Sequence, residues 1–213
     1  MAEKLFSDQL GQYLVDLVPP RPPEMQKMEA YAEEYGFPII GPASGYLCYQ
    51  IARMIGARRV FELGSGYGYS TAWFARAVQE NGGGVVHHVV WDEELSRMAR
   101  GHLETLGYGD IVEYRMSEAV AALEETPGPF DLIFNDIDKE GYPKSLPVIK
   151  EKLRSGGVLI VDNALWSGRV FDEGEQAEST QAIRELTRLI TGDEDWIATI
   201  APIRDGLLVA YKR

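Results

Sequence analysis

The chain is 213 residues long, and with 45% hydrophobic and 25% charged residues it has the composition of a globular protein large enough to bury a core. Its formal net charge of −12 argues against nonspecific binding to nucleic acid or to an anionic membrane. The single cysteine, Cys48, excludes an intrachain disulfide framework, and no Cys or His spacing suits zinc.

The first 36 residues predict two helices separated by a proline-rich elbow. Apolar residues recur at helical spacing over residues 4–18, the run stops at the prolines of residues 19–23, and a second helix over residues 24–35 ends at Gly36. Neither helix carries a catalytic pattern, so residues 1–36 are expected to serve as a lid or as a dimer contact. Because the N-terminus alternates charged and apolar residues, and no stretch approaches transmembrane length, we expect a cytoplasmic protein without a signal peptide.

The rest of the chain alternates short apolar runs with helical patterns, beginning with an extended loop over residues 37–42 and an apolar helix through Met54. Strands are then predicted over residues 60–63, 85–91, 111–115, 130–135, 158–161, 196–203 and 207–211, and helices over residues 72–78, 95–106, 119–125, 142–153 and 180–190. Gly156 and Gly157 are expected to end the helix before the fifth strand. This order predicts a single α/β domain over residues 1–213, with a doubly wound, mostly parallel seven-stranded sheet and an antiparallel C-terminal strand.

The first predicted strand leads into a glycine-rich turn that reads VFELGSGYGYST. Glycine lets the backbone approach a ligand closely, and the helix that follows offers unpaired N–H groups and the positive end of its dipole. A dinucleotide fingerprint, G-x-G-x-x-G, would need a third glycine at position 69, which is Tyr69. The spacing therefore disfavours an NAD-linked oxidoreductase.

The polar residues around this turn suit a different ligand. Glu62 lies two residues before Gly64, where a carboxylate is poorly suited to a pyrophosphate but well suited to a cationic amino group. Ser70, at the start of the helix, can cap the helix or bind a carboxylate. An acid and a helix N-terminus that face one turn match the amino and carboxyl groups of S-adenosylmethionine (SAM). The alternative is a plain strand–helix turn with a capping serine.

Oxygen-bearing side chains follow the fourth and fifth predicted strands. Asp136 comes directly after one strand, and Asp162 and Asn163 come directly after the other. Because the carboxyl ends of parallel strands meet at one edge of a sheet, these side chains are expected to converge on one crevice. Two carboxylates and an amide carbonyl suit Mg²⁺ or a similar divalent cation, although Asp162 and Asn163 are also typical of a simple turn.

Three segments carry a resemblance to a known family. FDLIFNDIDKEGYPK, GGVLIVDNALWSGRV and VFELGSGYGYS resemble the metal-dependent, SAM-dependent O-methyltransferases of the catechol and caffeoyl-CoA type, and the similarity runs from about residue 10 to the final strand. The resemblance implies a Rossmann-like methyltransferase fold and methyl transfer to a hydroxyl of a small phenolic substrate with adjacent hydroxyls. It also implies a divalent cation, Mg²⁺ or similar, and a homodimer.

The resemblance assigns roles to individual residues. Lys139 falls where the family keeps its general base, the group that takes the hydroxyl proton. The implied metal ligands are Asp136, Asp162 and Asn163. The implied cofactor contacts are Ile40, Glu62, Gly64, Gly66, Ser70 and Asp136, with Ser117, Glu118 and Ala119 in a loop that faces the adenine.

One position departs from the family's pattern. Members keep an acid at the end of the second strand for the ribose hydroxyls, and Val90 stands there, so either Asp92 reaches the cofactor or that contact is absent. Asp92 is also suited to cap the helix that follows. The departure motivates an alternative function, a protein of the same fold that binds SAM or S-adenosylhomocysteine (SAH) with little or no catalytic activity.

Other side chains near these motifs carry weaker signals. His87 and His88 are consecutive in a predicted strand, so they point to opposite faces and are not expected to bind one metal. Trp166 is expected either to form a wall for an aromatic acceptor or to pack, and Trp91 either to lie near the adenine or to pack. Residues 196–201 lack the carboxylate that the catechol enzyme uses for the second hydroxyl, so a vicinal hydroxyl compound is expected rather than strictly a catechol.

Overall fold

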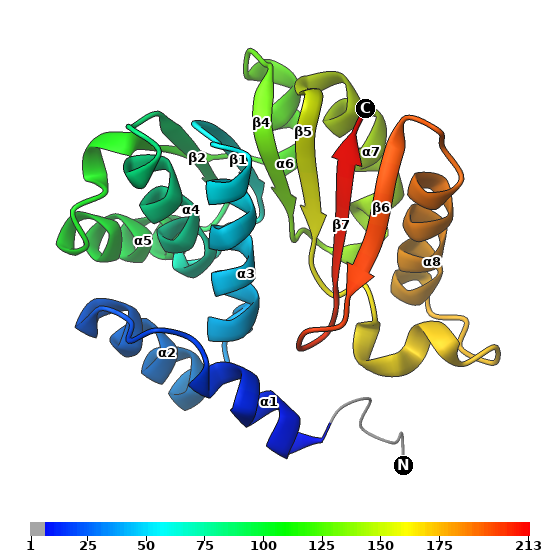
Figure 1. The fold of residues 1–213 in the computed structure, drawn as a ribbon, viewed down its shortest axis with the longest axis horizontal. Helices are drawn as coiled ribbons and strands as arrows, with labels where there is room; N and C mark the ends of the chain where they lie inside the picture. Colours follow the sequence, from blue (N-terminus) through cyan, green and yellow to red (C-terminus); the bar gives the residue numbers. More distant parts are fainter. Residues whose placement is uncertain (1–6) are drawn as a thin grey trace.

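The sheet of the computed structural model, which describes residues 7–213, has seven strands in the order β3-β2-β1-β4-β5-β7-β6 (Figure 1). The strands are β1 (Arg59–Leu63), β2 (Val85–Val90), β3 (Val112–Met116), β4 (Phe130–Asn135), β5 (Leu153–Val161), β6 (Trp196–Ala201) and β7 (Leu207–Lys212). The first five strands run parallel, and β7 is antiparallel to both of its neighbours. The prediction of a mostly parallel, doubly wound sheet with an antiparallel last strand is confirmed.

The order of the strands reverses between β1 and β4, which lie side by side. From β1 the chain moves outward through β2 and β3, and it then returns to β4 and continues through β5 on the other side. In such sheets the loops after the two diverging strands leave a crevice at their carboxyl ends. The residues after β1 and β4 therefore face each other where a ligand is expected.

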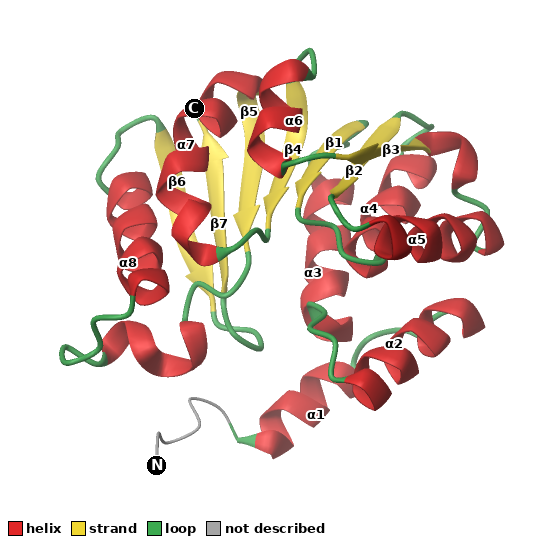
Figure 2. Cartoon of the chain, turned by 180° about the vertical axis from the view of Figure 1, so that it is seen from behind, coloured by secondary structure: helices red, strands yellow, loops and turns green. Residues whose placement is uncertain are grey.

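Helices cover both faces of the sheet (Figures 1 and 2). One layer holds α3 (Gly41–Met54), α4 (Tyr69–Glu80) and α5 (Glu93–Thr105), and the other holds α6 (Ala119–Glu125), α7 (Tyr142–Lys152) and α8 (Glu178–Thr191). Successive residues of a strand point to opposite faces, so in β1 Val60 packs in the first layer's core and Phe61 in the second's. The central strands are buried on both faces, which is why they read as continuous apolar runs in the sequence.

Two helices precede this three-layer arrangement of helices, sheet and helices. α1 (Asp8–Asp16) begins after Ser7, whose hydroxyl caps it, and α2 (Pro23–Tyr35) packs two methionines and an alanine into the core. α1 buries none of its residues. The helix predicted over residues 4–18 is observed over α1, and residues 4–6 lie outside the described residues. No helix within residues 7–213 is long and apolar enough to cross a membrane.

Predicted and observed elements agree to within one helical turn except at the start of β5. The sequence predicts a helix up to residue 153 that ends at Gly156 and Gly157, but β5 begins at Leu153. Leu153 pairs with Phe130 of β4, and the pairing register then shifts. Gly156 has a φ of +74°, and a Cβ on Gly157 would lie 2.9 Å from a backbone carbonyl oxygen of the same strand. The two glycines therefore permit an irregularity within a strand rather than end a helix.

Candidate active site

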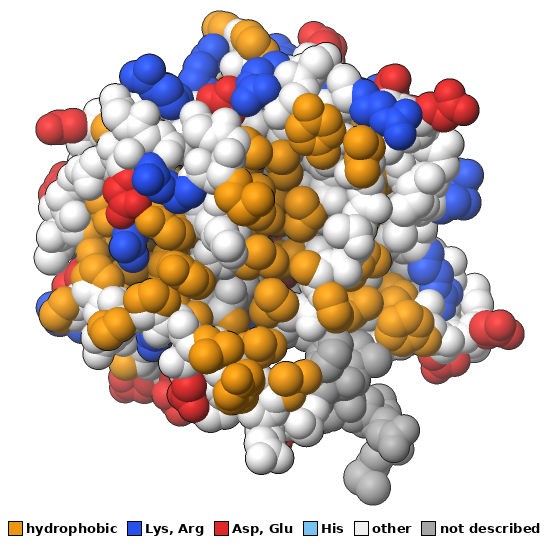
Figure 3. Space-filling model, in the orientation of Figure 1, with side chains coloured by type: hydrophobic (Ala, Val, Ile, Leu, Met, Phe, Trp, Pro, Cys, Tyr) orange, Lys and Arg blue, Asp and Glu red, His pale blue; other side chains and the backbone are white. Residues whose placement is uncertain are grey.

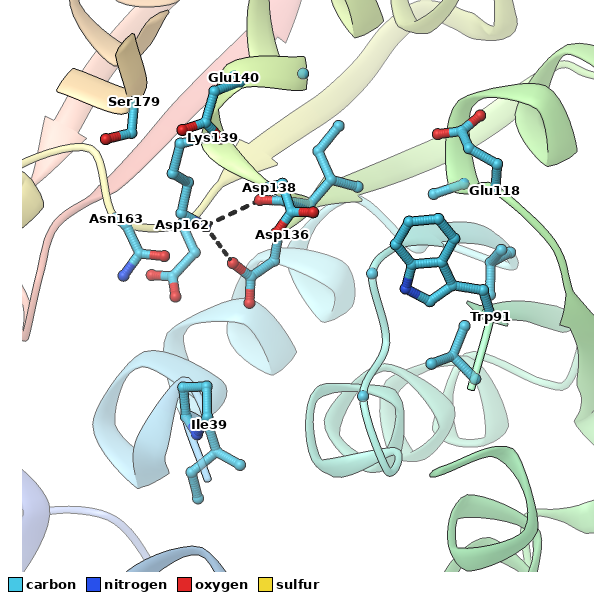
Figure 4. A pocket seen from close by; sticks show the side chains of 18 of the residues that line it. Ile39, Trp91, Glu118, Asp136, Asp138, Lys139, Glu140, Asp162, Asn163 and Ser179 are labelled. Atoms are coloured by element: carbon cyan, nitrogen blue, oxygen red, sulfur yellow. Dashed lines mark hydrogen bonds and ion pairs between the residues drawn. The ribbon is translucent and has the colours of Figure 1, made fainter. Parts of the chain in front are cut away.

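A cavity of about 640 Å³ opens at the carboxyl ends of the parallel strands, over the crevice between β1 and β4 (Figure 4). Its walls come from the ends of all five parallel strands and the loops after them, from the segment before α3, and from Arg204 in the β6–β7 hairpin. A second hollow of about 30 Å³ adjoins the cavity at the glycine loop and shares part of its wall. The larger cavity lies where the reversal in strand order predicts a ligand site.

The structure brings most of the predicted site residues to this cavity. The residues that line it are Gly64, Gly66, Ser117, Glu118, Ala119, Asp136, Lys139, Asp162 and Asn163. Ile40 and Ser70 border the smaller hollow. Glu62 and Asp92 line neither space.

The glycine loop after β1 is shaped by its contact with the end of β4. Gly64 has a φ of +83°, and a Cβ there would lie 2.5 Å from the carbonyl oxygen of Asp136. The Asp136 amide donates a hydrogen bond of 2.8 Å to the Leu63 carbonyl. Residue 64 therefore has to be glycine. The loop lies directly against Asp136, which is the first residue of the acidic edge, the group formed by Asp136, Asp162 and Asn163.

Ser70 does not cap the helix. α4 begins at Tyr69 with Gly68 at its N-cap position, which leaves Ser70 in the first turn, and no side chain caps this helix. The Ser70 hydroxyl instead interacts with Glu62 and, together with that of Thr71, favours the ionised form of that acid. Of the two roles predicted for Ser70, capping is wrong, because a glycine with φ +92° occupies the position before the helix.

Glu62 is fully buried behind the glycine loop. Burial raises the pKa of its carboxyl to about 7, although neighbouring hydroxyls oppose the shift. Thr71 Oγ1 donates a hydrogen bond to Oε2, whereas Oε1 has no partner at hydrogen-bonding geometry among the described residues. A buried carboxylate oxygen without a donor is costly. Glu62 therefore has an unused hydrogen-bond acceptor directly behind the glycine loop.

Thr71 and His88 form a buried contact that sequence reasoning missed. The Thr71 hydroxyl lies 3.0 Å from His88 Nδ1 while it donates to Glu62. Burial lowers the pKa of His88 to about 3, so the ring is neutral and can donate one N–H to Thr71. His87 lies on the opposite face, 3.2 Å from Glu113. Because successive side chains of a strand point to opposite faces, the sequence predicts that His87 and His88 point apart. The contact between His88 and Thr71 depends instead on how α4 packs against β2.

Asp136 and Asp162 lie together at the ends of β4 and β5. Asp162 is only 3% exposed, and burial together with the charge of Asp136 raises the pKa of its carboxyl to about 7. Burial also raises the pKa of Asp136, against the opposing effect of Lys139. Lys139 Nζ lies 2.8 Å from Asp136 Oδ1, and Arg204 Nη1 lies 3.4 Å from Asp162 Oδ2. A buried acid whose pKa is raised by a second acid marks a place that favours added positive charge.

The donors at this edge fit a divalent cation. Asn163 Nδ2 donates to Asp205 Oδ2 at 3.0 Å, which orients the amide and leaves its oxygen for a ligand. With the carboxylates of Asp136 and Asp162, this oxygen makes a hard donor set of the kind that Mg²⁺ prefers. Within residues 7–213 no group of three or more His, Cys, Asp or Glu side chains gathers to hold a metal. Water or substrate would therefore have to complete the coordination shell.

Lys139 is held at the acidic edge by its own loop. Its Nζ donates to Asp136 Oδ1 at 2.8 Å, to the Ile137 carbonyl at 3.2 Å and to the Tyr142 hydroxyl at 2.8 Å. Tyr142 is fully buried, and its hydroxyl donates in turn to the Asp162 carbonyl at 3.0 Å. The amino group is therefore a part of the site rather than a solvated loop lysine. Sequence reasoning missed Tyr142, and its position at the start of α7, three residues after Lys139, is the available signal.

Trp166 forms a wall next to the acidic edge. It begins the short 3-10 helix η3 (Trp166–Phe171) and lines the cavity, and Lys139 Nζ lies 5.9 Å from the centre of its ring. Arg184 of α8 holds the following segment by donating to four backbone carbonyls, those of Arg169, Val170, Asp172 and Glu175. The ring is therefore carried on a segment that is fastened to a core helix.

The other end of the cavity, beside β2 and β3, has no free carboxylate among the described residues that line it. Val90 and the 72% exposed Trp91 form part of this wall. Glu118 caps α6 with both of its carboxylate oxygens, through bonds of 3.0 and 2.7 Å to backbone amides. Asp92 caps α5 through a bond of 2.8 Å to a backbone amide. The structure thus places Asp92 in the capping role and away from the cavity wall.

Known proteins resemble this chain along most of its length. A family model described as O-methyltransferase matches residues 25–213. A protein of Mycolicibacterium smegmatis that is named for the same family is 31% identical over 185 residues, which cover 85% of this chain and 86% of the relative.

Two solved structures share the fold. One is the O-methyltransferase from Bacillus cereus in complex with SAH, with a TM-score of 0.86, 28% identity, and 96% of this chain and 97% of that chain covered. The other is TomG from Streptomyces achromogenes, an O-methyltransferase involved in tomaymycin synthesis, in complex with SAM. Its TM-score is 0.85 at 26% identity, with 100% of this chain and 99% of that chain covered.

Proposed function

This chain belongs to the O-methyltransferase family, and from that membership we propose that it moves a methyl group from SAM to a hydroxyl of a small phenol with adjacent hydroxyls, with the help of a divalent cation such as Mg²⁺. One observation carries the proposal. The partly exposed Asp136, the buried Asp162, the oriented amide of Asn163 and the amino group of Lys139 converge in a cavity that the glycine loop also borders. An oxygen-donor site and a proton acceptor thus lie beside a cradle for a methyl donor.

Support for SAM comes from the glycine loop and the acid behind it. The relatives from Bacillus cereus and Streptomyces achromogenes hold SAH and SAM, respectively. In this chain the unpaired Oε1 of Glu62 suits the ammonium of an amino acid moiety, and Gly64 in front of it lines the cavity. We assign Ile40, Gly66 and Ser70 to the same half of the ligand, and Ser117, Glu118 and Ala119 to the adenine.

Support for a divalent cation comes from the chemistry of the donors. When bound, such an ion would hold two adjacent phenolic oxygens and lower the pKa of the attacking hydroxyl. The chain's own part is to present the oxygens of Asp136, Asp162 and Asn163 from the fixed ends of two neighbouring strands. Because these strand ends belong to the buried centre of the sheet, the donors are placed before any ligand arrives.

The proposed reaction is an in-line displacement. The phenolic oxygen forms a bond to the methyl carbon as the bond from that carbon to sulfur breaks, and the sulfur keeps the electron pair, which leaves SAH. The hydroxyl proton passes to Nζ of Lys139 in its amine form. Tyr142 keeps that nitrogen at the acidic edge, and Trp166 supports the acceptor's ring. The remaining rate acceleration comes from the alignment of the acceptor oxygen with the methyl carbon of SAM.

A calorimetric titration with SAM, in Mg²⁺ and again after chelation, tests the proposal when it is combined with a methyl transfer assay on catechol. We expect SAM to bind under both conditions and turnover to require the cation. Turnover that survives chelation would overturn the role of the cation. Failure of SAM to bind would overturn the assignment of the glycine loop.

A second candidate function is a SAM- or SAH-binding protein of the same fold with little or no catalytic activity. It is favoured by the β2–β3 end of the cavity, where Val90 lies and where Glu118 is engaged as a helix cap. A ribose held without a carboxylate loses hydrogen bonds that the family's acid would provide. This candidate predicts calorimetric binding of SAM without cation-stimulated turnover of any vicinal diol.

We also infer that two copies of the chain pair through an apolar face that includes α1. A nine-residue helix that buries none of its residues needs a packing partner to be stable. Ile197 of β6 and Tyr211 of β7 are paired in register, and both are exposed on the face of the sheet opposite α7 and α8. Figure 3 shows hydrophobic side chains gathered over this face of the molecule. In this proposal α1 is a dimer contact rather than a lid.

Light scattering tests the pairing. The wild type should have the mass of two 23.8 kDa chains, and Leu17→Glu and Ile197→Glu should each give a single chain. Met116→Glu, at an exposed apolar residue on β3, is the matched control and should leave the mass unchanged. A wild type that remains a single chain at micromolar concentration would overturn the pairing.

A further inference from the structure

Arg204 lies at the tip of the β6–β7 hairpin and lines the cavity at its acidic edge. Its backbone is left-handed, with a φ of 52°, a conformation that residues other than glycine seldom adopt. Residues held in such conformations cluster at binding and catalytic sites, because the surrounding structure has to enforce them. The side chain is 38% exposed, so the guanidinium can be reached by a ligand in the cavity.

The guanidinium of Arg204 has unused donors. Arg184 donates through Nε, Nη1 and Nη2 to backbone carbonyls, and Arg21 holds Glu29 through two bonds of 2.6 and 2.9 Å. Within residues 7–213 Arg204 makes one bond, from Nη1 to Asp162 at 3.4 Å. Charge-assisted bonds of this kind are usually about 2.7–2.9 Å long. Most of the five N–H groups of Arg204 are therefore left for another acceptor.

The hairpin fixes the place of this side chain. Asp205 accepts hydrogen bonds from Asn163 Nδ2, at 3.0 Å, and from the Ser167 amide. The Leu165 amide donates to the Asp205 carbonyl at 2.9 Å, and a Cβ on Gly206 would lie 2.5 Å from the Leu165 side chain. The tip is thus fastened to the loop after β5. The hairpin therefore holds Arg204 in position before a ligand binds.

We propose that Arg204 binds an anionic group of the acceptor, so that the preferred substrate is a vicinal dihydroxy aromatic compound that carries a carboxylate. The inference rests on the proposed function and adds a substrate class to it. The hydroxyls would lie at Asp136, Asp162 and Asn163, and the ring against Trp166. The carboxylate would accept from Nε and Nη2 of Arg204, the edge that the bond to Asp162 leaves unused. A guanidinium presents two parallel donors that match the geometry of a carboxylate.

Arg204 also neutralises Asp162, and the two roles differ in what they predict for acceptors. A residue that only neutralises Asp162 acts on the site whichever acceptor is bound, so its loss changes the turnover of all acceptors by one factor. A residue that binds the acceptor's carboxylate acts only on acceptors that have one. The ratio of activities on two matched acceptors therefore separates the roles.

The matched acceptors are 3,4-dihydroxybenzoate and catechol, which differ by the carboxylate alone. The wild type should have the higher kcat/KM on the acid. In Arg204→Gln the ratio of kcat/KM for the acid to that for catechol should fall by about tenfold to hundredfold, mainly through KM, as expected for lost charge-assisted hydrogen bonds. Arg204→Lys should restore part of the ratio. Arg169→Gln removes a cation of η3 that does not line the cavity, and it should leave the ratio unchanged.

A wild type without preference for the acid, or an equal loss on both acceptors in Arg204→Gln, would overturn the assignment. A binding measurement gives a readout that does not depend on turnover. In the presence of SAH, 3,4-dihydroxybenzoate should bind about tenfold more weakly to Arg204→Gln than to the wild type, and catechol should show a smaller change. If SAM binds and neither acceptor is methylated, the proposed function fails, while this titration still decides whether Arg204 binds the carboxylate.

Discussion

The half of the cavity around β1 is built from backbone, whereas the half around β4 and β5 is built from charged side chains. Around β1, a glycine loop forms the wall, and the buried side chains of Glu62 and Thr71 support it from behind. Around β4 and β5, Asp136 and Asp162 face the cavity, with a lysine and an arginine against them. The first half depends on the shape of its backbone, and the second on charges that separate loops bring together.

This difference implies two kinds of sensitivity to substitution. Side chains at the acidic edge face the half of the cavity proposed for the acceptor, so the removal of Asp162 or Lys139 should cost turnover and leave the binding of SAM intact. The polar groups behind the glycine loop are buried, so their replacement should change stability and the affinity for SAM together. Single substitutions in each half test that separation.

Asp162→Ala should have the largest effect, because it removes a donor of the proposed cation site. Turnover should fall on the order of 10³-fold and lose its response to Mg²⁺. The affinity for SAM, measured by calorimetry, should stay within about twofold of the wild type. Asp110→Ala removes an exposed acid of the short helix η1 (Gly109–Ile111) and serves as the matched control. A large loss of SAM affinity in Asp162→Ala would show that the two halves are not separable.

Lys139→Met should have the next largest effect. It keeps the length of the side chain and removes the proposed proton acceptor, so kcat should fall by about 10²- to 10³-fold. Steady-state kinetics on catechol measure the loss, and calorimetry should show unchanged binding of SAM. Lys139→Arg keeps the positive charge but cannot accept a proton, so it should not restore the rate. Full activity in either variant would remove Lys139 from the mechanism.

Glu62→Gln should act on the other half of the cavity, where it weakens the binding of SAM by about tenfold to hundredfold at pH 8. The same variant should stabilise the free protein. The pKa of Glu62 is about 7 in the fold against an ordinary value of 4.5, so folding favours the protonated acid, and stability is lost as the pH rises from about 4.5 to about 7. The advantage of the variant should be on the order of 3 kcal/mol at pH 8 and less than half of that at pH 5.5, by urea unfolding. A difference that does not change with pH would contradict this account.

The affinity of the wild type for SAM should depend on the same ionisation. An ionised Glu62 attracts an ammonium group and a protonated one does not, so the dissociation constant should rise by up to about tenfold for each pH unit below 7. Calorimetric titrations between pH 5.5 and 8.5 measure the trend. Glu62→Gln should show a much flatter profile over this range. Parallel profiles for the two proteins would assign the pH dependence to another group.

Val90→Glu should have the smallest effect, and it is a gain. It places a carboxylate at the end of β2, where ribose hydroxyls could donate to it, and the affinity for SAM should rise by about threefold to tenfold. The gain stays modest because Val90 is nearly buried and the new charge loses hydration. Val90→Gln, of similar size and without charge, should gain less. A loss of affinity in both variants would show that the ribose lies elsewhere.

The sequence predicted the sheet, the glycine loop and the acidic edge because each of these depends on short local sequence patterns and on their order along the chain. The order of strands and helices determines the fold, and a parallel sheet brings the residues after β4 and β5 to one edge. The pair Gly156 and Gly157 misled the prediction, because the same two residues that end a helix also permit an irregularity within a strand. Local patterns do not distinguish these two uses.

The contacts that sequence reasoning missed join segments that are far apart in the chain. Thr71 meets His88 only because α4 packs on β2, and Arg204 meets Asp162 only because the last hairpin folds back over β5. Tyr142 is close to Lys139 in sequence, but its hydroxyl gains its role from the Asp162 carbonyl. These contacts depend on the tertiary structure, so a pattern in a single sequence cannot reveal them.

The close contact between Gly64 and Asp136 has a consequence for how the two substrates affect each other's binding. The Asp136 amide is bonded to the Leu63 carbonyl, and the Asp136 carbonyl leaves no room for a Cβ at residue 64. A ligand that steadies the glycine loop therefore also steadies Asp136, which is proposed to help orient the acceptor. The acceptor should bind more tightly once SAM is seated, and thermodynamic reciprocity requires the same factor in the opposite direction. Initial-rate kinetics should then show a sequential mechanism in which a rising concentration of either substrate lowers the KM for the other.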